Sequence, residues 1–247
     1  MKTTFKKALL SSSAASMMAF ALSCGATNAL TVGPDMVEEK RKASDFSEVQ
    51  LKGPVDGYIK IGKKFSVTVK APEDMQDKII TEVKGDKLII KMKKGRYNWK
   101  EYKDVAVYVT MPSIDEYTAS GSGDSHLSGK IKGKEFEVNL NGSGDITVET
   151  SSATELDVDL TGSGDLEIKG GKCTTISASL KGSGDISTKG VKCTKGSFSI
   201  MGSGDIDAYA SNSAKSNIMG SGDVTIYGSP KEISSRTFGS GEVKTRK

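Results

Sequence analysis

The tetrapeptide Gly-Ser-Gly-Asp recurs at a nearly constant interval through the second half of this chain. It occurs six times and is followed by one Gly-Ser-Gly-Glu. The copies begin at Gly121, Gly142, Gly162, Gly182, Gly202, Gly220 and Gly239. Neighbouring copies are 18 to 21 residues apart. A period of this size is typical of proteins in which one supersecondary unit stacks on the next, so the repeat predicts a solenoid.

Apolar and polar residues alternate on both sides of each glycine turn. Ile146 and Val148 follow one turn, and Leu156, Val158 and Leu160 precede the next. This alternation predicts short strands with one buried face. One repeat is too small to bury that face alone, so the repeats must stack strand on strand, about 4.8 Å apart. We therefore expect an all-β chain that forms a single parallel β-solenoid with coils of about 20 residues and GSGD turns.

The aspartates of the repeats should form a column of outward-facing carboxylates at the spacing of the coils. They are Asp124, Asp145, Asp165, Asp185, Asp205 and Asp223. One interpretation is structural, with each side chain accepting backbone N–H groups of its own corner. The other is a calcium site, because calcium prefers oxygen ligands. Calcium-binding β-rolls repeat every nine residues rather than every 20, which favours the structural interpretation.

The start of the chain has the pattern of an export signal. A basic segment that contains Lys2, Lys6 and Lys7 precedes an apolar stretch that is too short to span a membrane. We interpret residues 1–29 as a signal peptide. It ends either before Cys24, as in a lipoprotein lipidated at that cysteine, or by cleavage after Ala29.

Three segments follow the predicted signal peptide. Residues 30–43 are polar and charged without periodicity, and we interpret them as a tether. Residues 44–118 contain strand patterns with irregular turns, which predict either the beginning of the solenoid or a sheet that covers its first coil. Within this segment, Gly85-Asp86 between two apolar runs predicts a hairpin. Residues 119–247 form the regular part of the predicted solenoid.

Two of the three cysteines occupy equivalent positions in adjacent repeats. Cys173 and Cys193 each lie nine residues before the next glycine turn, in the sequence Lys-Cys-Thr. Equivalent positions in stacked coils are about 4.8 Å apart, which is within the range that a disulfide bridges. The pair is therefore expected to form either a disulfide or two stacked thiols.

The recurring Gly-Ser-Gly-Asp-Ile, preceded by the segment Val105–Ile114 and by Ser120, resembles the family called putative auto-transporter adhesin, head GIN domain. The resemblance extends from about Phe46 to the C-terminus. It implies an exported, non-enzymatic β-helical protein of the bacterial envelope, with right-handed coils.

Charge and composition argue against several classes of function. Without the three lysines of the leader, 32 basic residues remain against 31 acidic ones, a net charge of +1. Near-neutrality gives no general case for nucleic-acid binding. The single histidine, His126, lies in an outward slot without the sequence context of a catalytic triad. We expect no enzymatic activity, no metal and no cofactor, and contact with a membrane only through a lipid on Cys24.

Two outward columns become apolar or aromatic in the last coils. They contain Met201, Tyr209, Met219, Tyr227 and Phe238. An exposed apolar patch usually marks a contact surface. Either the C-terminal strand folds back over these residues as a cap, or they bind a second copy or another envelope component.

The sequence therefore predicts an exported protein of the cell envelope, in the periplasm or at the outer membrane. The first hypothesis is an adhesin-like module that presents rigid solenoid faces to a glycan polymer or a protein. The alternative is a structural envelope lipoprotein that self-assembles through its C-terminal coils.

Overall fold

The structure, a computed structural model, describes residues 35–98 and 104–247. It is nearly all β, with 2% helix, and it forms a parallel β-solenoid of about seven turns with coils of about 20 residues. This confirms the predicted fold class. The predicted signal peptide and Cys24 lie outside the described residues. No helix in the described ranges is long and apolar enough to cross a membrane.

The strands and the single short helix follow one another along the chain. They are β1 (Met36–Arg41), β2 (Glu48–Lys52), β3 (Asp56–Ile61), β4 (Ser66–Pro72), α1 (Glu73–Gln76), β5 (Ile79–Lys84), β6 (Lys87–Met92), β7 (Ala106–Met111), β8 (Glu116–Gly121), β9 (Ser125–Gly142), β10 (Ile146–Gly162), β11 (Leu166–Ile168), β12 (Gly171–Gly182), β13 (Ile186–Ser187), β14 (Val191–Gly202), β15 (Ile206–Tyr209), β16 (Ser213–Gly220), β17 (Val224–Tyr227), β18 (Glu232–Gly239) and β19 (Val243–Arg246).

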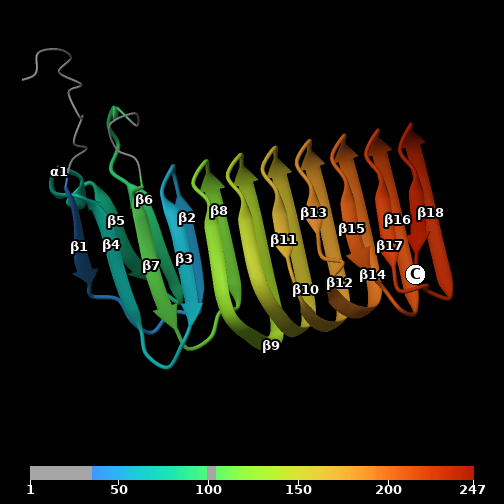
Figure 1. The fold of residues 1–247 in the computed structure, drawn as a ribbon, viewed down its shortest axis with the longest axis horizontal. Helices are drawn as coiled ribbons and strands as arrows, with labels where there is room; N and C mark the ends of the chain where they lie inside the picture. The colour runs from blue at the N-terminus through green and yellow to red at the C-terminus, as the bar shows by residue number, and fades with distance from the viewer. Residues whose placement is uncertain (1–34, 99–103) are drawn as a thin grey trace, which may run out of the picture. The chain divides into compact units, whose positions relative to one another are not determined.

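Each regular coil contributes one strand on either side of its GSGD corner, and the coils stack in parallel (Figure 1). The strands that precede the corner form one face, in the order β8-β9-β10-β12-β14-β16-β18, which we call the long-strand face. The strands that follow the corner form the short-strand face, in which the first residues of β9 and β10 continue into β11, β13, β15, β17 and β19. The inward side chains of both faces fill one apolar core.

Glycine is required at the corners because the backbones of adjacent coils touch there. A Cβ atom added at Gly184 would lie 1.9 Å from the carbonyl oxygen of Gly164 in the preceding coil. At Gly182 the same distance to the oxygen of Gly162 would be 2.0 Å, and its φ of +139° disfavours other residues. The repeat motif is therefore a consequence of close coil-to-coil approach at one edge of the solenoid.

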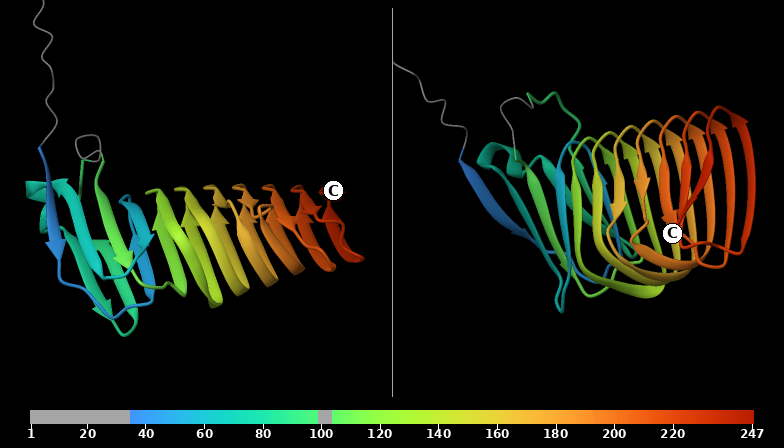
Figure 2. Two further views of the ribbon diagram at one scale, coloured as in Figure 1. Left: turned by 60° about the horizontal axis from the view of Figure 1, so that its bottom comes forward. Right: turned by 45° about the vertical axis from the view of Figure 1, so that its right-hand side comes forward.

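The irregular N-terminal part contains both structures that the sequence left open. β2 and β3 form a coil of the solenoid, which pairs in parallel with β8 and the first residues of β9 on one side. On its other side it pairs in parallel with β6 and β7. β4 and β5 then add antiparallel strands at the end of the stack, β4 beside β7 and β5 beside β6 (Figure 2). The predicted hairpin is confirmed, because β5 and β6 pair around Gly85-Asp86.

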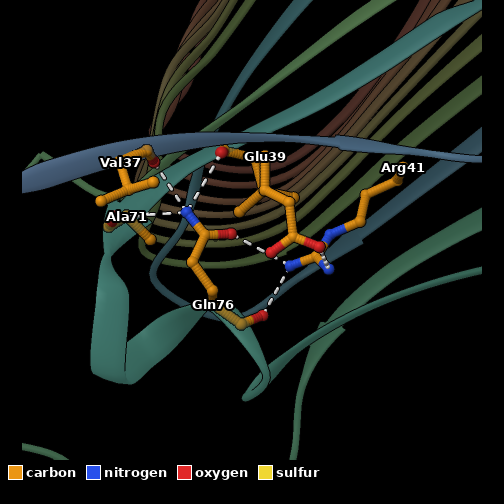
Figure 3. A network of polar contacts seen from close by, with 6 residues as sticks. Val37, Glu39, Arg41, Ala71 and Gln76 are labelled. Atoms are coloured by element: carbon orange, nitrogen blue, oxygen red, sulfur yellow. Dashed lines mark hydrogen bonds and ion pairs between the residues drawn. The ribbon is translucent and has the colours of Figure 1, made fainter.

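The prediction of a patternless tether is wrong for residues 36–41, which form strand β1 antiparallel to β4. A buried glutamine on α1, Gln76, fastens this strand to the domain (Figure 3). Its amide nitrogen donates to the carbonyl oxygens of Val37 and Ala71, at 2.7 and 3.2 Å. The guanidinium of Arg41 donates to the backbone oxygen of Gln76 at 2.6 Å. β1 lacks the usual alternation because it is an edge strand with mostly exposed side chains.

Candidate functional site

The six repeat aspartates form a continuous ladder along the corner between the two faces. Each carboxylate from Asp124 to Asp205 accepts a hydrogen bond from the backbone N–H of the aspartate in the next coil, with N···Oδ1 distances of 2.7 to 2.9 Å. The expectation that each side chain would accept N–H groups of its own corner is therefore wrong. The coils are so close at their glycine corners that the neighbouring backbone is the nearer donor.

The ladder is longer than the repeat motif indicates. It begins at Asp56, whose Oδ1 accepts the N–H of Asp124 at 2.9 Å, and it ends where Asp223 accepts the N–H of Glu242 at 2.8 Å. Burial, and then the nearby charges of Asp124 and Asp104, raise the pKa of Asp56, although its hydrogen bond from Asp124 opposes the shift. The sequence feature that could have identified Asp56 as a member of the ladder is Gly53-Pro54-Val55-Asp56. It keeps the Gly-x-x-Asp spacing of the repeats but lacks their serine and second glycine.

Two adjoining hollows follow the ladder on the short-strand face. The first has a volume of about 240 Å³ and is lined by Tyr58, Asp124, Ser125, His126, Asp145 and Thr147. The second has a volume of about 320 Å³ and is lined by Asp145, Ile146, Thr147, Asp165, Leu166, Glu167, Asp185 and Ser187. They share Asp145 and Thr147, and we call the combined hollow the carboxylate groove. Its walls repeat with the coils and carry mainly hydrogen-bond acceptors and hydroxyl groups.

Aromatic side chains mark the N-terminal end of the groove. The rings of Tyr58 and Tyr108 stack at a centroid distance of 5.0 Å, and both residues are exposed. His126 lies beside Tyr58 in the strand register, and its Nε2 is 3.5 Å from an oxygen of Glu149. Sequence reasoning placed His126 on the surface but missed the tyrosine pair. The pairing of Tyr58 with Tyr108 depends on a register between strands that are about 50 residues apart in the chain, for which no local pattern exists.

The ladder does not have the arrangement of a metal centre in the described part of the chain. No group of three or more His, Cys, Asp or Glu residues there is placed to hold a metal ion. One oxygen of each ladder carboxylate from Asp124 to Asp223 is already hydrogen-bonded to the adjacent coil. The calcium interpretation of the aspartate column therefore has no support from the geometry.

Cys173 and Cys193 lie side by side in the register of β12 and β14, and their sulfur atoms are bonded. Their Cα atoms are 4.5 Å apart, as stacking in adjacent coils requires. Of the two alternatives left open by the sequence, the structure contains the disulfide. It joins consecutive coils on the long-strand side of the solenoid.

The apolar residues of the last coils form two columns instead of one patch. Met201, Met219 and Phe238 stack in register on β14, β16 and β18, with 52%, 46% and 69% of their surfaces exposed. Tyr209 and Tyr227 pair on β15 and β17, on the other side of the corner. The Nζ atom of Lys192 lies 4.0 Å from the centre of the Tyr209 ring.

The expected fold-back of the C-terminal strand over these columns does not occur. β18 and β19 continue the parallel stack as a further coil, pairing with β16 and β17. All eight residues of β18 are exposed. The expected cap is absent from the described residues because the sequence of the last coil keeps the repeat spacing and can stack once more. The column of Met201, Met219 and Phe238 consequently stays exposed to solvent.

Comparisons with known proteins agree with the fold. The profile of the family described as putative auto-transporter adhesin, head GIN domain, matches residues 45–230. A crystal structure of a putative adhesin from Bacteroides fragilis is 21% identical over 86% of this chain and 97% of its own, with a TM-score of 0.82. One of a putative adhesin from Parabacteroides distasonis is 20% identical over 86% and 98%, with a TM-score of 0.71.

A third solved structure, of a putative lipid binding protein from Parabacteroides distasonis, is 24% identical to this chain. It covers 86% of this chain and 97% of its own, with a TM-score of 0.73. The comparison with curated proteins gives no match. At these identities, the solved structures establish the shared fold.

Proposed function

Because this chain belongs to the family described as putative auto-transporter adhesin, head GIN domain, we propose that it is an exported, non-enzymatic protein of the cell envelope. In this proposal it acts as an adhesin-like binding module. Its rigid solenoid faces meet a polymer or a protein outside the cell. The proteins from Bacteroides fragilis and Parabacteroides distasonis that share the fold are described as putative adhesins, which supports this assignment.

The carboxylate groove is the observation that carries the proposal. Its lining repeats with the coils, so that a partner with its own repeat meets similar acceptor groups at each step. The groove is acidic, because its lining includes Glu167 and four carboxylates of the ladder. An extended partner that carries hydroxyl, amide or ammonium donors matches this surface. Loops would hold such groups less rigidly than stacked, in-register strands.

Binding of a lipid is a weaker candidate for this chain, although one protein of the same fold is described as a putative lipid binding protein. Acyl chains require an apolar cavity. The groove is lined mainly by carboxylates and hydroxyl groups, and the inward side chains of the coils pack into a closed core. A polar polymer or a protein surface therefore matches the groove better.

The alternative proposal is a structural envelope lipoprotein that assembles through its C-terminal coils. The specific observation in its favour is the open last coil, in which β18 is exposed along its whole length. Ile233 and Phe238 on this strand are 46% and 69% exposed. Among the described residues β18 pairs only with β16, and a strand edge without a partner offers its backbone groups to another chain.

A binding screen with groove variants tests the leading proposal. The variants Thr147→Arg and Glu167→Arg place long cationic side chains in the groove without replacing any aspartate of the ladder. Thr225→Arg is the matched control, since Thr225 occupies the same outward row two coils beyond the groove lining. Wild-type protein and the control should bind the same glycans or cells, and the groove variants should lose binding. Equal binding by all four proteins, or no binding by any, would contradict the proposed role of the groove.

A further inference from the structure

The long-strand face carries a cluster of uncompensated carboxylates toward its N-terminal end. Outward residues of β9 and β10 supply them, namely Glu135, Glu137, Glu155, Asp157 and Asp159. We call them the acidic patch. None of them takes part in an ion pair with another described residue. Burial, and then the fields of its four neighbours in the patch, raise the pKa of Asp157. The patch is thus a concentration of negative charge that a binding partner of opposite charge would stabilise.

The same face carries a basic patch nearer the C-terminus. It consists of Lys195 on β14, Lys215 on β16 and Arg236 on β18, which are all exposed. The ion pairs of the described residues include none of these three cations. Within one molecule, two or more coil steps separate the charges of the two patches, and the smallest separation, between Glu155 and Lys195, is about 10 Å. Asp157 and Lys215 lie in one outward row but are separated by three coil steps, or about 14 Å.

Small side chains lie between the two patches. The outward positions of β12 and β14 next to the patches are Ser177, Ser179, Ser197 and Ser199. Such side chains leave these two rows flat, which favours the close approach of another sheet, and the larger outward side chains of Lys181 and Met201 lie beyond them at the end of the same strands. The face therefore has negative charge at one end, positive charge at the other, and a flat centre.

We propose that a second copy of this chain docks on the long-strand face, related by a two-fold axis that runs parallel to the strands between β12 and β14. This axis places β10 of each copy opposite β16 of the other, and β9 opposite β18. The row Asp157-Ser177-Ser197-Lys215 is then self-complementary, since Asp157 of each copy meets Lys215 of the other. Two-fold symmetry forms every such contact twice.

Two of the remaining cations and the size of the face agree with this arrangement, whereas Glu135 of each copy comes opposite Glu232 of the other, a like-charge contact that opposes it. Arg236 of the second copy comes opposite Asn139 and beside Glu137, and Lys195 comes next to Glu155. From β9 to β18 the face spans five strand spacings, and its strands pair over about eight residues, which gives about 600 Å² per copy. The total of about 1,200 Å² is the lower limit for a specific interface. The proposal does not depend on the carboxylate groove, which lies on the other face.

Light scattering of the full-length protein at low and high salt tests the dimer. The wild type should be a dimer at low salt and dissociate as salt rises, because the contacts are largely ionic. Asp157→Lys and Lys215→Asp should each raise the dimer dissociation constant about tenfold or more, since each places like charges opposite one another twice. The double variant should restore the dimer, which also shows that both substitutions leave the fold intact. Glu167→Lys, on the short-strand face, is the matched control and should remain dimeric.

Two results would overturn the proposal. One is a wild-type monomer at low salt and at concentrations on the order of 100 µM. The other is a dimer that neither charge reversal affects, which would place the interface elsewhere, for example at the open edge of β18.

Discussion

Substitution of a corner glycine should destabilise the solenoid far more than substitution of a glycine outside the corner. In Gly184→Ala, the new Cβ would lie 1.9 Å from the carbonyl oxygen of Gly164 and 2.9 Å from the carbonyl carbon of Ser163. Both obstacles are backbone atoms. They are held in place because Ser183 and Gly184 donate to the oxygen of Gly162 at 2.9 and 3.3 Å. The clash can therefore be relieved only by separating two coils.

Overpacking that shifts the backbone costs about 1–3 kcal/mol, and we expect about 3 kcal/mol for Gly184→Ala because no flexible side chain can move away. For a chain of this size, that loss corresponds to a decrease in Tm of about 6–12 °C. The matched control is Gly170→Ala in the same coil. Its Cβ would meet only the oxygen of Glu149, at 3.9 Å. The control should be neutral, or stabilised by up to about 1 kcal/mol through the lower entropy of the unfolded chain.

Urea unfolding followed by circular dichroism measures both variants against the wild type. The expected order of stability is Gly170→Ala equal to or above the wild type, with Gly184→Ala well below both. Equal midpoints for the two alanine variants would refute the argument that coil-to-coil backbone contact is the reason for glycine at the corners.

Three further perturbations follow from the contacts described above. Asp185→Ala should cost about 1 kcal/mol in the free energy of unfolding, because it removes the acceptor for the Asp205 N–H, whereas Asp185→Asn keeps an acceptor and should match the wild type in urea unfolding. Asp157→Asn should stabilise the fold of the monomer at pH 7, measured in dilute protein where the contact with Lys215 of the proposed dimer is absent. The folded state binds the proton of Asp157 more tightly than the unfolded chain does, so the wild type is most stable below pH 3.8, the ordinary pKa of aspartate, and loses this stability as pH rises through the raised pKa of the folded state. Asparagine is neutral at every pH. In thermal melts its advantage over the wild type should therefore vanish below about pH 4. Replacing Cys173 and Cys193 by serine should lower the unfolding free energy by about 3 kcal/mol, since the bond closes a loop with a sequence separation of 20, and equal urea midpoints for oxidised and reduced protein would contradict this.

The regular half of the fold could be predicted because its determinants are local. The spacing of the glycine turns sets the coil length, and alternation around residues such as Ile146 and Val148 assigns the inward positions, which are buried as expected. The adjacency of Cys173 and Cys193 follows from the same register. In these coils each strand pairs with its equivalent one repeat away, so that sequence position determines the neighbour in space.

The N-terminal part lacked that correspondence. The coil of β2 and β3 pairs with β6 and β7 on one side and with β8 and β9 on the other, although β4 to β7 follow it in the chain. This order depends on tertiary packing, and no periodic pattern encodes it. β1 was missed because its side chains are mostly exposed and its attachment depends on the polar contacts of Gln76 and Arg41.

Part of the candidate site was equally inaccessible from the sequence. The six aspartates were found as a column, but their hydrogen-bond donors could be identified only from the distance between adjacent corners. The Tyr58–Tyr108 pair and the groove require the register between β3 and β7 and the orientation of side chains from several coils. Such features depend on how coils are placed against each other, whereas sequence periodicity describes one coil at a time.

Protease accessibility on living cells tests the proposed adhesin-like function most directly. A protease recognition site inserted between Lys84 and Gly85 is suitable, because both residues are exposed at the hairpin turn and the insertion leaves in place the Asp86 carbonyl, which accepts the N–H groups of Ser47 and Glu48. Cleavage of the purified variant is the positive control, and a periplasmic protein is the control for membrane integrity. Our account predicts cleavage on intact cells. Protection until the outer membrane is permeabilised would contradict a role in adhesion and favour a structural protein inside the envelope.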